Sequence, residues 1–397
     1  MRRVVITGAG VISALGPDLP SFWAALADGR SGIGPIRALD CSALRFSNGA
    51  EVQGFDPFLH FDPKVAMQLD RTVQLAGVAA AEALKMSGLT LQPSRTAVVT
   101  GCCVGGKTTE DESYRQLFEE KKTRFDPLTI PKVMANGAAS WISMHHGITG
   151  PAYTVSTACA SAAHAIGQAF WMVRAGVVDA ALAGGNEAPF ALGLLRSWEA
   201  MRVVAPDTCR PFTTDRKGLI LGEGAAILVM ETLESATARG AHILGEICGF
   251  GMTSDASHIT MPSAEGAAAA MRTALAEGGL APEQIGYINA HGTGTQANDV
   301  TETRAIHSVF AHPPLVSSTK SMHGHTLGAA GALEAVAALM PFECGLLPPT
   351  ANFTQADPAC DLDVIPNVAR PAKVEAVLSN SFAFGGLNAV LAFRRVG

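Results

Sequence analysis

Short apolar strands that end in glycine turns alternate with helical segments along this chain, and the alternation occurs twice. In the first half, strands are expected at residues 2–8, 96–101, 152–157, 180–185 and 225–231, and helices at 22–26, 70–86 and 161–175. After Gly240 a similar order returns, with strands at 243–250, 285–290 and 389–393 and helices at 264–277 and 328–340. The pattern predicts an α/β fold with two similar halves.

The two halves are expected to share one core, because no low-complexity linker or short-period repeat separates them. We place an N-terminal half at residues 1–245 and a C-terminal half at residues 246–397. Hydrophobic residues make up 48% of the chain and charged residues 16%, which is typical of a compact enzyme and not of a disordered chain.

Charge, cysteine usage and hydropathy restrict the partners and the compartment. The net charge of −6 gives no indication of a nucleic-acid partner. The eight cysteines form no CxxC pair, which favours reduced thiols in a cytoplasmic protein. The apolar run at residues 4–6 is too short for a secretory signal, and glycine, proline or charge interrupts the other apolar stretches, so no membrane span is expected.

Cys159, in the run TACASAAH, falls between a predicted strand and the first turn of a predicted helix. Free amides and the positive end of the helix dipole at such a place are expected to lower the pKa of the thiol, and they can also hold an oxyanion. The small flanking residues leave room for a substrate. The alternative interpretation is that Cys159 is a small buried residue, as most free cysteines are.

Two histidines also follow predicted strands on loops of small residues, His291 in NAHGTGT and His325 in STKSMHGHTLG. Neutral imidazoles could donate hydrogen bonds to the enolate left when a malonyl thioester loses carbon dioxide. A satisfied structural role is the alternative for each, and His323 with His325 forms an i, i+2 pair that lacks a third zinc ligand. Lys320 is either a solvated charge or a buried cation that needs a partner such as Glu334.

Four segments together resemble a known family. The runs TACASAAH, NAHGTGT followed by NDVTE, STKSMHGHTLGAAGALE and SNSFAFGGLNA are similar, in order and spacing, to the signatures of elongating β-ketoacyl-(acyl-carrier-protein) synthases. The resemblance runs from Val4 to the C-terminal strand. It implies the thiolase fold, with five αβαβα layers in two similar halves that each contain a mixed sheet.

The resemblance also implies a reaction, the decarboxylative Claisen condensation of an acyl group with malonyl-carrier protein. Cys159 would be the acylated nucleophile, and His291 and His325 the decarboxylation pair. Lys320 corresponds to the lysine beside the second histidine and Glu334 to its buried carboxylate partner. No cofactor is expected beyond the phosphopantetheine thioesters of the acyl carrier protein.

Further roles are implied for residues around this centre. Thr293 and Thr295 would face the phosphopantetheine arm, and the amides of Cys159 and Phe384 would form an oxyanion hole, with Phe384 as a gate and Phe382 near it. Asp255 and His258 match a second loop that supports the gate. Some relatives hold a buried structural cation at four positions. In this chain these are Asn289, Glu334, Ser379 and Asn380.

The chain departs from the family pattern at the gate, in the acyl pocket and on the docking face. Ala383 and Leu387 stand where glycine and threonine are common, which restricts the backbone of the gate. The positions expected in the acyl pocket are Val104, Trp198 and, from a dimer partner, Thr129. Met67 and Gln68 replace residues that are often basic. Docking of the acidic carrier then falls to Arg202, Lys121, Lys122, Arg124 and Lys64, or these residues form an ordinary solvated face.

These departures favour a specialised polyene, polyketide or lipid pathway, and housekeeping fatty-acid elongation is the alternative. The chain is expected to form a homodimer, or a heterodimer with a chain-length-factor-like subunit. A non-catalytic partner subunit would lack Cys159. A degradative thiolase would use a second cysteine as base, and a cysteine hydrolase would need an orienting carboxylate or amide for its histidine.

Overall fold

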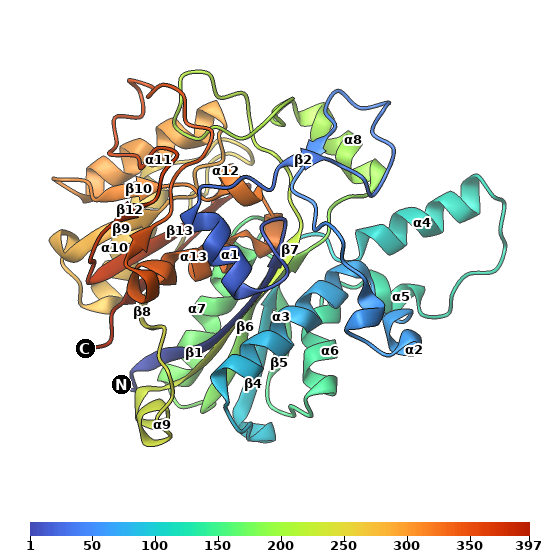
Figure 1. Cartoon of the computed structure of the whole chain (residues 1–397), viewed down its shortest axis with the longest axis horizontal. Coiled ribbons are helices and arrows are strands. Elements are labelled where there is room, and N and C mark those ends of the chain that lie inside the picture. The colour runs from blue at the N-terminus through green and yellow to red at the C-terminus, as the bar shows by residue number, and fades with distance from the viewer.

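A computed structural model describes the whole chain, Met1–Gly397, and its centre is a ten-stranded mixed sheet (Figure 1). The strands of the first half are β1 (Val4–Ser13), β4 (Thr96–Gly101), β5 (Ala152–Val155), β6 (Ala180–Glu187) and β7 (Gly224–Thr232). Those of the second half are β8 (Gly245–Ser254), β9 (Ile285–Asn289), β10 (Leu315–Ser317), β13 (Ala376–Ala383) and β14 (Leu387–Arg394).

The two halves have the same topology. The strand order is β1-β7-β6-β4-β5 in the first half and β8-β14-β13-β9-β10 in the second, and each strand corresponds to its counterpart in chain order. The directions agree as well, because β7 and β14 are antiparallel to both neighbours whereas the last three strands of each half are parallel. The halves meet where β1 pairs with β8 over three residue pairs.

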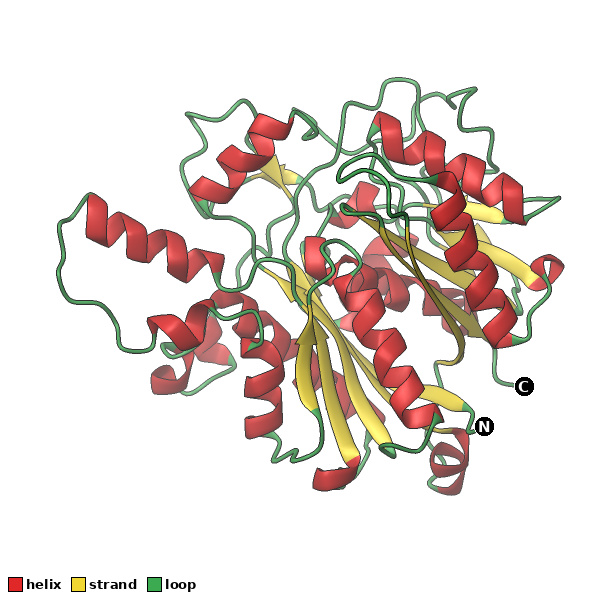
Figure 2. Cartoon of the chain, turned by 180° about the vertical axis from the view of Figure 1, so that it is seen from behind, coloured by secondary structure: helices red, strands yellow, loops and turns green.

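The five strands of each half form one β layer, and helices form three layers outside and between these two halves of the sheet. Together they give the five layers of the thiolase fold (Figure 2). The outer layers are α3 (Arg71–Ser87) on the first half and α10 (Ala264–Gly278) with α11 (Gln296–Val309) on the second. The inner layer contains α7 (Ser161–Arg174) and α13 (Ala330–Cys344). α13 is buried almost all round because it packs between the two halves of the sheet, as expected of a helix with no polar face.

Local signals set the ends of the outer helices. The side chain of Asp70 accepts a hydrogen bond from the amide of Thr72 at the start of α3, and Gly88 ends that helix with φ of 59°. Ser263 and Gly279 do the same for α10. The remaining helices are α1 (Leu19–Ala27), α2 (Pro63–Ala66), α4 (Lys107–Phe118), α5 (Thr129–Val133), α6 (Gly137–His145), α8 (Leu192–Met201), α9 (Leu233–Ala238) and α12 (Lys320–His323).

Short pieces complete the fold. They are the strand pairs β2 (Gly34–Pro35) with β3 (Asn48–Gly49) and β11 (Leu346–Leu347) with β12 (Arg370–Pro371), and four 3₁₀ turns, η1 (Pro57–Leu59), η2 (Pro93–Arg95), η3 (Pro282–Gln284) and η4 (Leu327–Ala329). The proposed boundary at residue 245 falls on the first residue of β8.

One expectation from the sequence needs correction here, that every apolar stretch is interrupted before it reaches the length of a membrane span. The segment Leu327–Cys344 is apolar enough and long enough to cross a bilayer, but 89% of it is buried inside the protein, where it packs as the core helix just described.

An arm at residues 107–134, which contains α4 and α5, was not predicted from the sequence. It extends away from the sheet (Figure 1). Apolar side chains of the arm such as Tyr114 and Phe118 are exposed, so it lacks the buried stripe by which amphipathic helices are recognised.

Candidate active site

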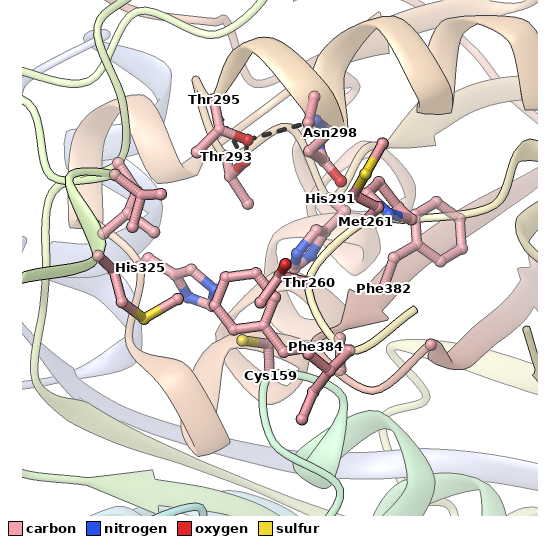
Figure 3. Close-up of a pocket in the computed structure, with 18 of the residues that line it drawn as sticks. Cys159, Thr260, Met261, His291, Thr293, Thr295, Asn298, His325, Phe382 and Phe384 are labelled. Carbon is pink, nitrogen blue, oxygen red and sulfur yellow. Dashed lines mark hydrogen bonds between the residues drawn. The ribbon is translucent and has the colours of Figure 1, made fainter. Parts of the chain in front are cut away.

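Cys159, His291 and His325 line one cavity of about 410 Å³, in which residues from both halves meet (Figure 3). Cys159 follows β5, His291 follows β9 and His325 follows β10, so each comes after the carboxyl end of a parallel strand, where α/β proteins commonly bind their ligands. Much of the cavity lining is apolar. The apolar lining residues include Trp198, Met201, Val203, Leu219, Ile259, Met261, Phe382 and Phe384.

A strained turn holds Cys159 between β5 and α7. Ala158 has a positive φ of 48°, which is unfavourable for a residue with a side chain. The turn is fixed through Ser161, whose hydroxyl accepts a hydrogen bond from the amide of Thr157 at 2.8 Å and donates one to the carbonyl of Ala158 at 2.6 Å. Cys159 is only 6% exposed, and its sulfur therefore has a defined position in the wall of the cavity.

Burial raises the pKa of the Cys159 thiol to about 11, so the expected lowering of this pKa is wrong in direction. The positive charge of Lys320 and the backbone N–H groups of Phe384 and Cys159 act in the opposite sense, but they do not outweigh the loss of solvent around the sulfur. The same two amides, which lower the pKa of the thiol, are those of the predicted oxyanion hole.

The two histidines face each other with ring centroids 5.5 Å apart and planes at 85°. Burial, and next the charge of Lys320, lower the pKa of both His291 and His325 well below 6.5, so both rings are neutral at pH 7. The amide of Leu327 donates to Nδ1 of His325 at 3.2 Å, and the ammonium of Lys320 lies 3.2 Å from Nδ1 of His291. Nδ1 is therefore the acceptor in each ring, and the proton is on Nε2.

Lys320 is fully buried and forms an ion pair with Glu334, which is fully buried as well. Its ammonium contacts the first histidine directly, since it also donates to the carbonyl oxygen of His291 at 2.7 Å. Burial raises the pKa of Glu334 to about 7 against the opposing charge of Lys320. The interpretation of Lys320 as a solvated surface charge is thus excluded.

The predicted gate is the tight turn between β13 and β14, in which Gly385 and Gly386 have φ of 85° and 71°. Phe384 lies against Trp198 of α8, with centroids 6.1 Å apart and planes at 28°, and Phe382 packs against the ring of His291.

Two neighbouring segments hold this turn. The amide of Gly385 donates to the carbonyl of Ile259 at 2.7 Å, and the amide of Asp255 donates to the carbonyl of Gly386 at 2.9 Å. His258 lines the cavity beside them.

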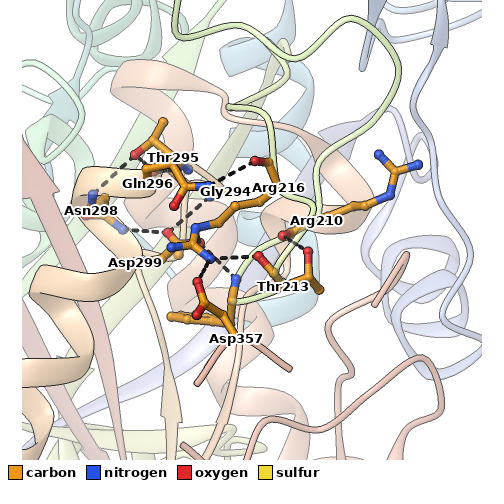
Figure 4. A network of polar contacts seen from close by, with 12 residues as sticks. Arg210, Thr213, Arg216, Gly294, Thr295, Gln296, Asn298, Asp299 and Asp357 are labelled. Carbon is orange, nitrogen blue, oxygen red and sulfur yellow. Dashed lines mark hydrogen bonds and ion pairs between the residues drawn. The ribbon is translucent and has the colours of Figure 1, made fainter. Parts of the chain in front are cut away.

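Thr293 and Thr295 line the mouth of the cavity, and their hydroxyls lie 2.9 Å apart. A buried polar network supports their loop (Figure 4). Asp299 accepts hydrogen bonds from the amides of Gly294 and Phe212, and Arg216 lies 3.7 Å from Asp299 with its guanidinium fully buried. The network joins the loop at residues 292–295 to the segment at residues 212–216.

Other predicted residues lie outside this cavity. Val104 does not line it but donates its amide to Glu187, and Thr129 begins α5 on the arm. Arg202 ends α8 at the rim, between the cavity residues Met201 and Val203. The remaining basic residues are spread over α2 (Lys64) and the loop after α4 (Lys121, Lys122 and Arg124).

The four positions of the predicted cation site share one property, a buried side-chain oxygen without a hydrogen-bond partner. These atoms are Oδ1 of Asn289, Oε2 of Glu334, Oγ of Ser379 and Oδ1 of Asn380. Oxygen ligands suit a hard cation, so the residues fit such an ion. The zinc interpretation fails, because both ring nitrogens of His323 already bond to Gly324 and Thr319.

Several cavity residues escaped the sequence analysis. Asn298 lies in the NDVTE run, which was noted without a role for this residue. Leu219 carries no local signal. The segment at residues 259–262 carries none either, because Ile259 and Met261 are 73% and 63% exposed at the rim, as in an ordinary loop.

Sequence comparisons identify the family of the chain. Residues 1–236 match the family described as "Beta-ketoacyl synthase, N-terminal domain", and residues 244–354 match "Beta-ketoacyl synthase, C-terminal domain". The chain is 50% identical over 402 residues to nodulation protein E of Rhizobium sp. (strain N33), with 100% of both chains covered.

Two further relatives are informative. The chain is 42% identical to 3-oxoacyl-[acyl-carrier-protein] synthase 2 of Synechocystis sp., with 99% of this chain and 98% of the relative covered. A solved structure, the ishigamide ketosynthase/chain length factor, superimposes with a TM-score of 0.96 at 39% identity and covers 100% of both chains. The chain therefore belongs to the β-ketoacyl synthase family, whose members are condensing acyltransferases.

Proposed function

We propose that Cys159 accepts an acyl group from a carrier-bound thioester and that His291 and His325 then direct its condensation with malonyl-carrier protein. The observation that carries this assignment is the convergence of one buried thiol and two neutral imidazoles on a single cavity. In the first step the sulfur of Cys159 attacks the acyl carbonyl, the carrier thiol leaves with the proton, and the amides of Cys159 and Phe384 hold the oxyanion.

In the second step the malonyl thioester loses carbon dioxide. Nε2–H of His291 and of His325 donate to the thioester oxygen as it becomes an enolate, because both rings carry their proton on that atom. The enolate carbon attacks the acyl-cysteine carbonyl, and the sulfur of Cys159 departs and regains a proton. The product is a β-ketoacyl thioester two carbons longer than the primer.

Burial keeps the histidines neutral in the first place, and Lys320, held by its ion pair with Glu334, is proposed to reinforce this because its ammonium lies against His291 and disfavours a second positive charge. Asn289, Glu334, Ser379 and Asn380 would hold a structural cation, which supplies rigidity and takes no part in the reaction. No further cofactor is proposed.

The acidic acyl carrier protein is the proposed partner, docked at the rim beside Arg202 with Lys64, Lys121, Lys122 and Arg124 as further contacts. The arm is proposed to pair with a second subunit, since its apolar side chains are exposed in the single chain. Identity of 39% to a ketosynthase/chain-length-factor protein supports a heterodimer as much as a homodimer.

A specialised lipid or polyketide pathway in the cytoplasm is the proposed setting, supported by 50% identity to nodulation protein E. Housekeeping fatty-acid elongation stays the second candidate, supported by 42% identity to the Synechocystis synthase.

The test is mass spectrometry of the intact protein after incubation with short, medium and unsaturated acyl-carrier proteins, with Cys159→Ala as control. Malonyl-carrier protein is then added. We expect an acyl mass on the wild type alone, discharged as the elongated β-ketoacyl product. Absence of an acyl mass with every donor, even with candidate partner subunits co-expressed, would contradict the proposal.

A further inference from the structure

Glu187, the last residue of β6, is a fully buried carboxylate with no part in the steps above. Its donors are backbone amides and one thiol. Oε2 accepts from the amides of Cys103 at 2.8 Å and Gly328 at 2.9 Å, and Oε1 accepts from the amide of Val104 at 3.2 Å and the thiol of Cys102 at 3.4 Å. One side chain thus joins the loop after β4 to the loop after β10.

The second of these loops has a strained backbone. Leu327 has a positive φ of 47°, a conformation that is costly for a residue with a branched side chain. Gly328 packs so closely that an added Cβ would lie 2.4 Å from the amide nitrogen of Cys103 and 2.6 Å from Oε2 of Glu187. Such a turn persists only where its surroundings hold it, and the side chain of Glu187 accepts the hydrogen bond of its Gly328 amide.

The same turn determines the tautomer of His325. The amide of Leu327 donates to Nδ1 of His325, and the next amide, that of Gly328, donates to Glu187. The backbone of His325 is held separately, by hydrogen bonds to Ile220 and from Gly222. Loss of the clamp at Gly328 would therefore release the imidazole ring while the main chain of His325 stays in place.

We propose that Glu187 is a positioning residue that holds the Leu327–Gly328 turn and thereby keeps the proton of His325 on Nε2, the atom that faces the reacting thioester. The inference rests on the proposed role of His325. A carboxylate suits this place because it only accepts hydrogen bonds, whereas glutamine would turn an NH₂ group toward one pair of donors.

The test separates the two half-reactions in Glu187→Gln. Acylation of Cys159 is followed by intact-protein mass spectrometry, and decarboxylation by release of carbon dioxide from malonyl-carrier protein on the pre-acylated enzyme. We expect decarboxylation to fall about tenfold or more, because a misdirected imidazole loses its hydrogen bond to the enolate, and acylation to fall about threefold at most. Glu231→Gln is the matched control, since Glu231 is equally buried at the end of β7 but far along the strand from the cavity.

A second readout does not depend on activity. Nitrogen chemical shifts of isotope-labelled histidine should report Nε2–H for His325 in the wild type and in Glu231→Gln, and a mixture with Nδ1–H in Glu187→Gln. If the wild type fails to condense while the tautomer still depends on Glu187, the proposed function fails and the positioning role stands. An unchanged tautomer, or an equal fall in both half-reactions, overturns the positioning role. So does failure of both Glu187→Gln and Glu187→Asp to fold, which would make Glu187 structural.

Discussion

The two halves of the molecule have one topology but place different chemistry at equivalent points. Cys159 lies between β5 and α7, and His325 lies between their counterparts, β10 and α13. The turn after β4 bears Cys103 and Val104, and the turn after its counterpart β9 bears His291. The scaffold fixes where side chains converge, and the loops decide what those side chains do.

Burial favours the neutral form in both halves, but the consequences for the proposed chemistry differ. In the first half, loss of solvent raises the pKa of Cys159 to about 11 and so disfavours the thiolate of the proposed nucleophile. In the second half, loss of solvent lowers the pKa of both histidines, which preserves the neutral form that donates a hydrogen bond. One dry cavity therefore favours the neutral thiol and the neutral imidazoles alike.

Removal of the nucleophile should give the largest effect. Cys159→Ala is expected to abolish acylation, a loss of about 10⁴-fold or more, because no other group in the cavity can form the thioester. Intact-protein mass spectrometry measures it. Cys103→Ala, the neighbouring thiol in the first half, is the control, and acylation of the Cys159→Ala variant would show that the nucleophile lies elsewhere.

Removal of either histidine should impair decarboxylation much more than acylation. His291→Ala and His325→Ala are expected to lower decarboxylation by about 10²–10⁴-fold and to leave acylation of Cys159 within a few-fold of the wild type, because enolate stabilisation arises only in the second step. Carbon dioxide release and acyl mass measure the two steps. His307→Ala, a partly exposed histidine paired with Asp361, should change neither.

The pH dependence of thiol reactivity tests how strongly burial raises the pKa of Cys159. Because the pKa of Cys159 is about 11, the thiolate fraction rises about tenfold per pH unit through the range from pH 7 to roughly 9.5. Alkylation by iodoacetamide, followed by peptide mapping, should show that unbroken slope. A rate that levels off near pH 9, the value of an ordinary thiol, would mean that the cavity does not desolvate the sulfur.

The smallest effect is expected at the gate. Trp198→Leu removes the aromatic partner of Phe384, an interaction worth about 0.5–1.5 kcal/mol, so the rate of acylation should change about two- to tenfold. The change should depend on acyl chain length, since Trp198 also forms a wall of the cavity. Trp23→Leu, in α1, is the control, and an equal response of all chain lengths would leave Trp198 without a part in selectivity.

The sequence by itself determined the repeated order of strands and helices and the residues proposed to carry the chemistry. Both depend on local patterns: strands show in short apolar runs, and Cys159, His291 and His325 lie in contiguous motifs of small residues. The pairing of Lys320 with Glu334 followed as well, because an ammonium among buried residues requires a carboxylate.

Only the tertiary structure decided the protonation states and the supporting contacts. The helix dipole predicted a lowered pKa for Cys159, but burial of the sulfur in the folded protein raises it. Glu187 gave no local signal, since its donors come from loops about 80 and 140 residues distant. Burial and long-range hydrogen bonds are sums over neighbours that the chain brings together only when it folds.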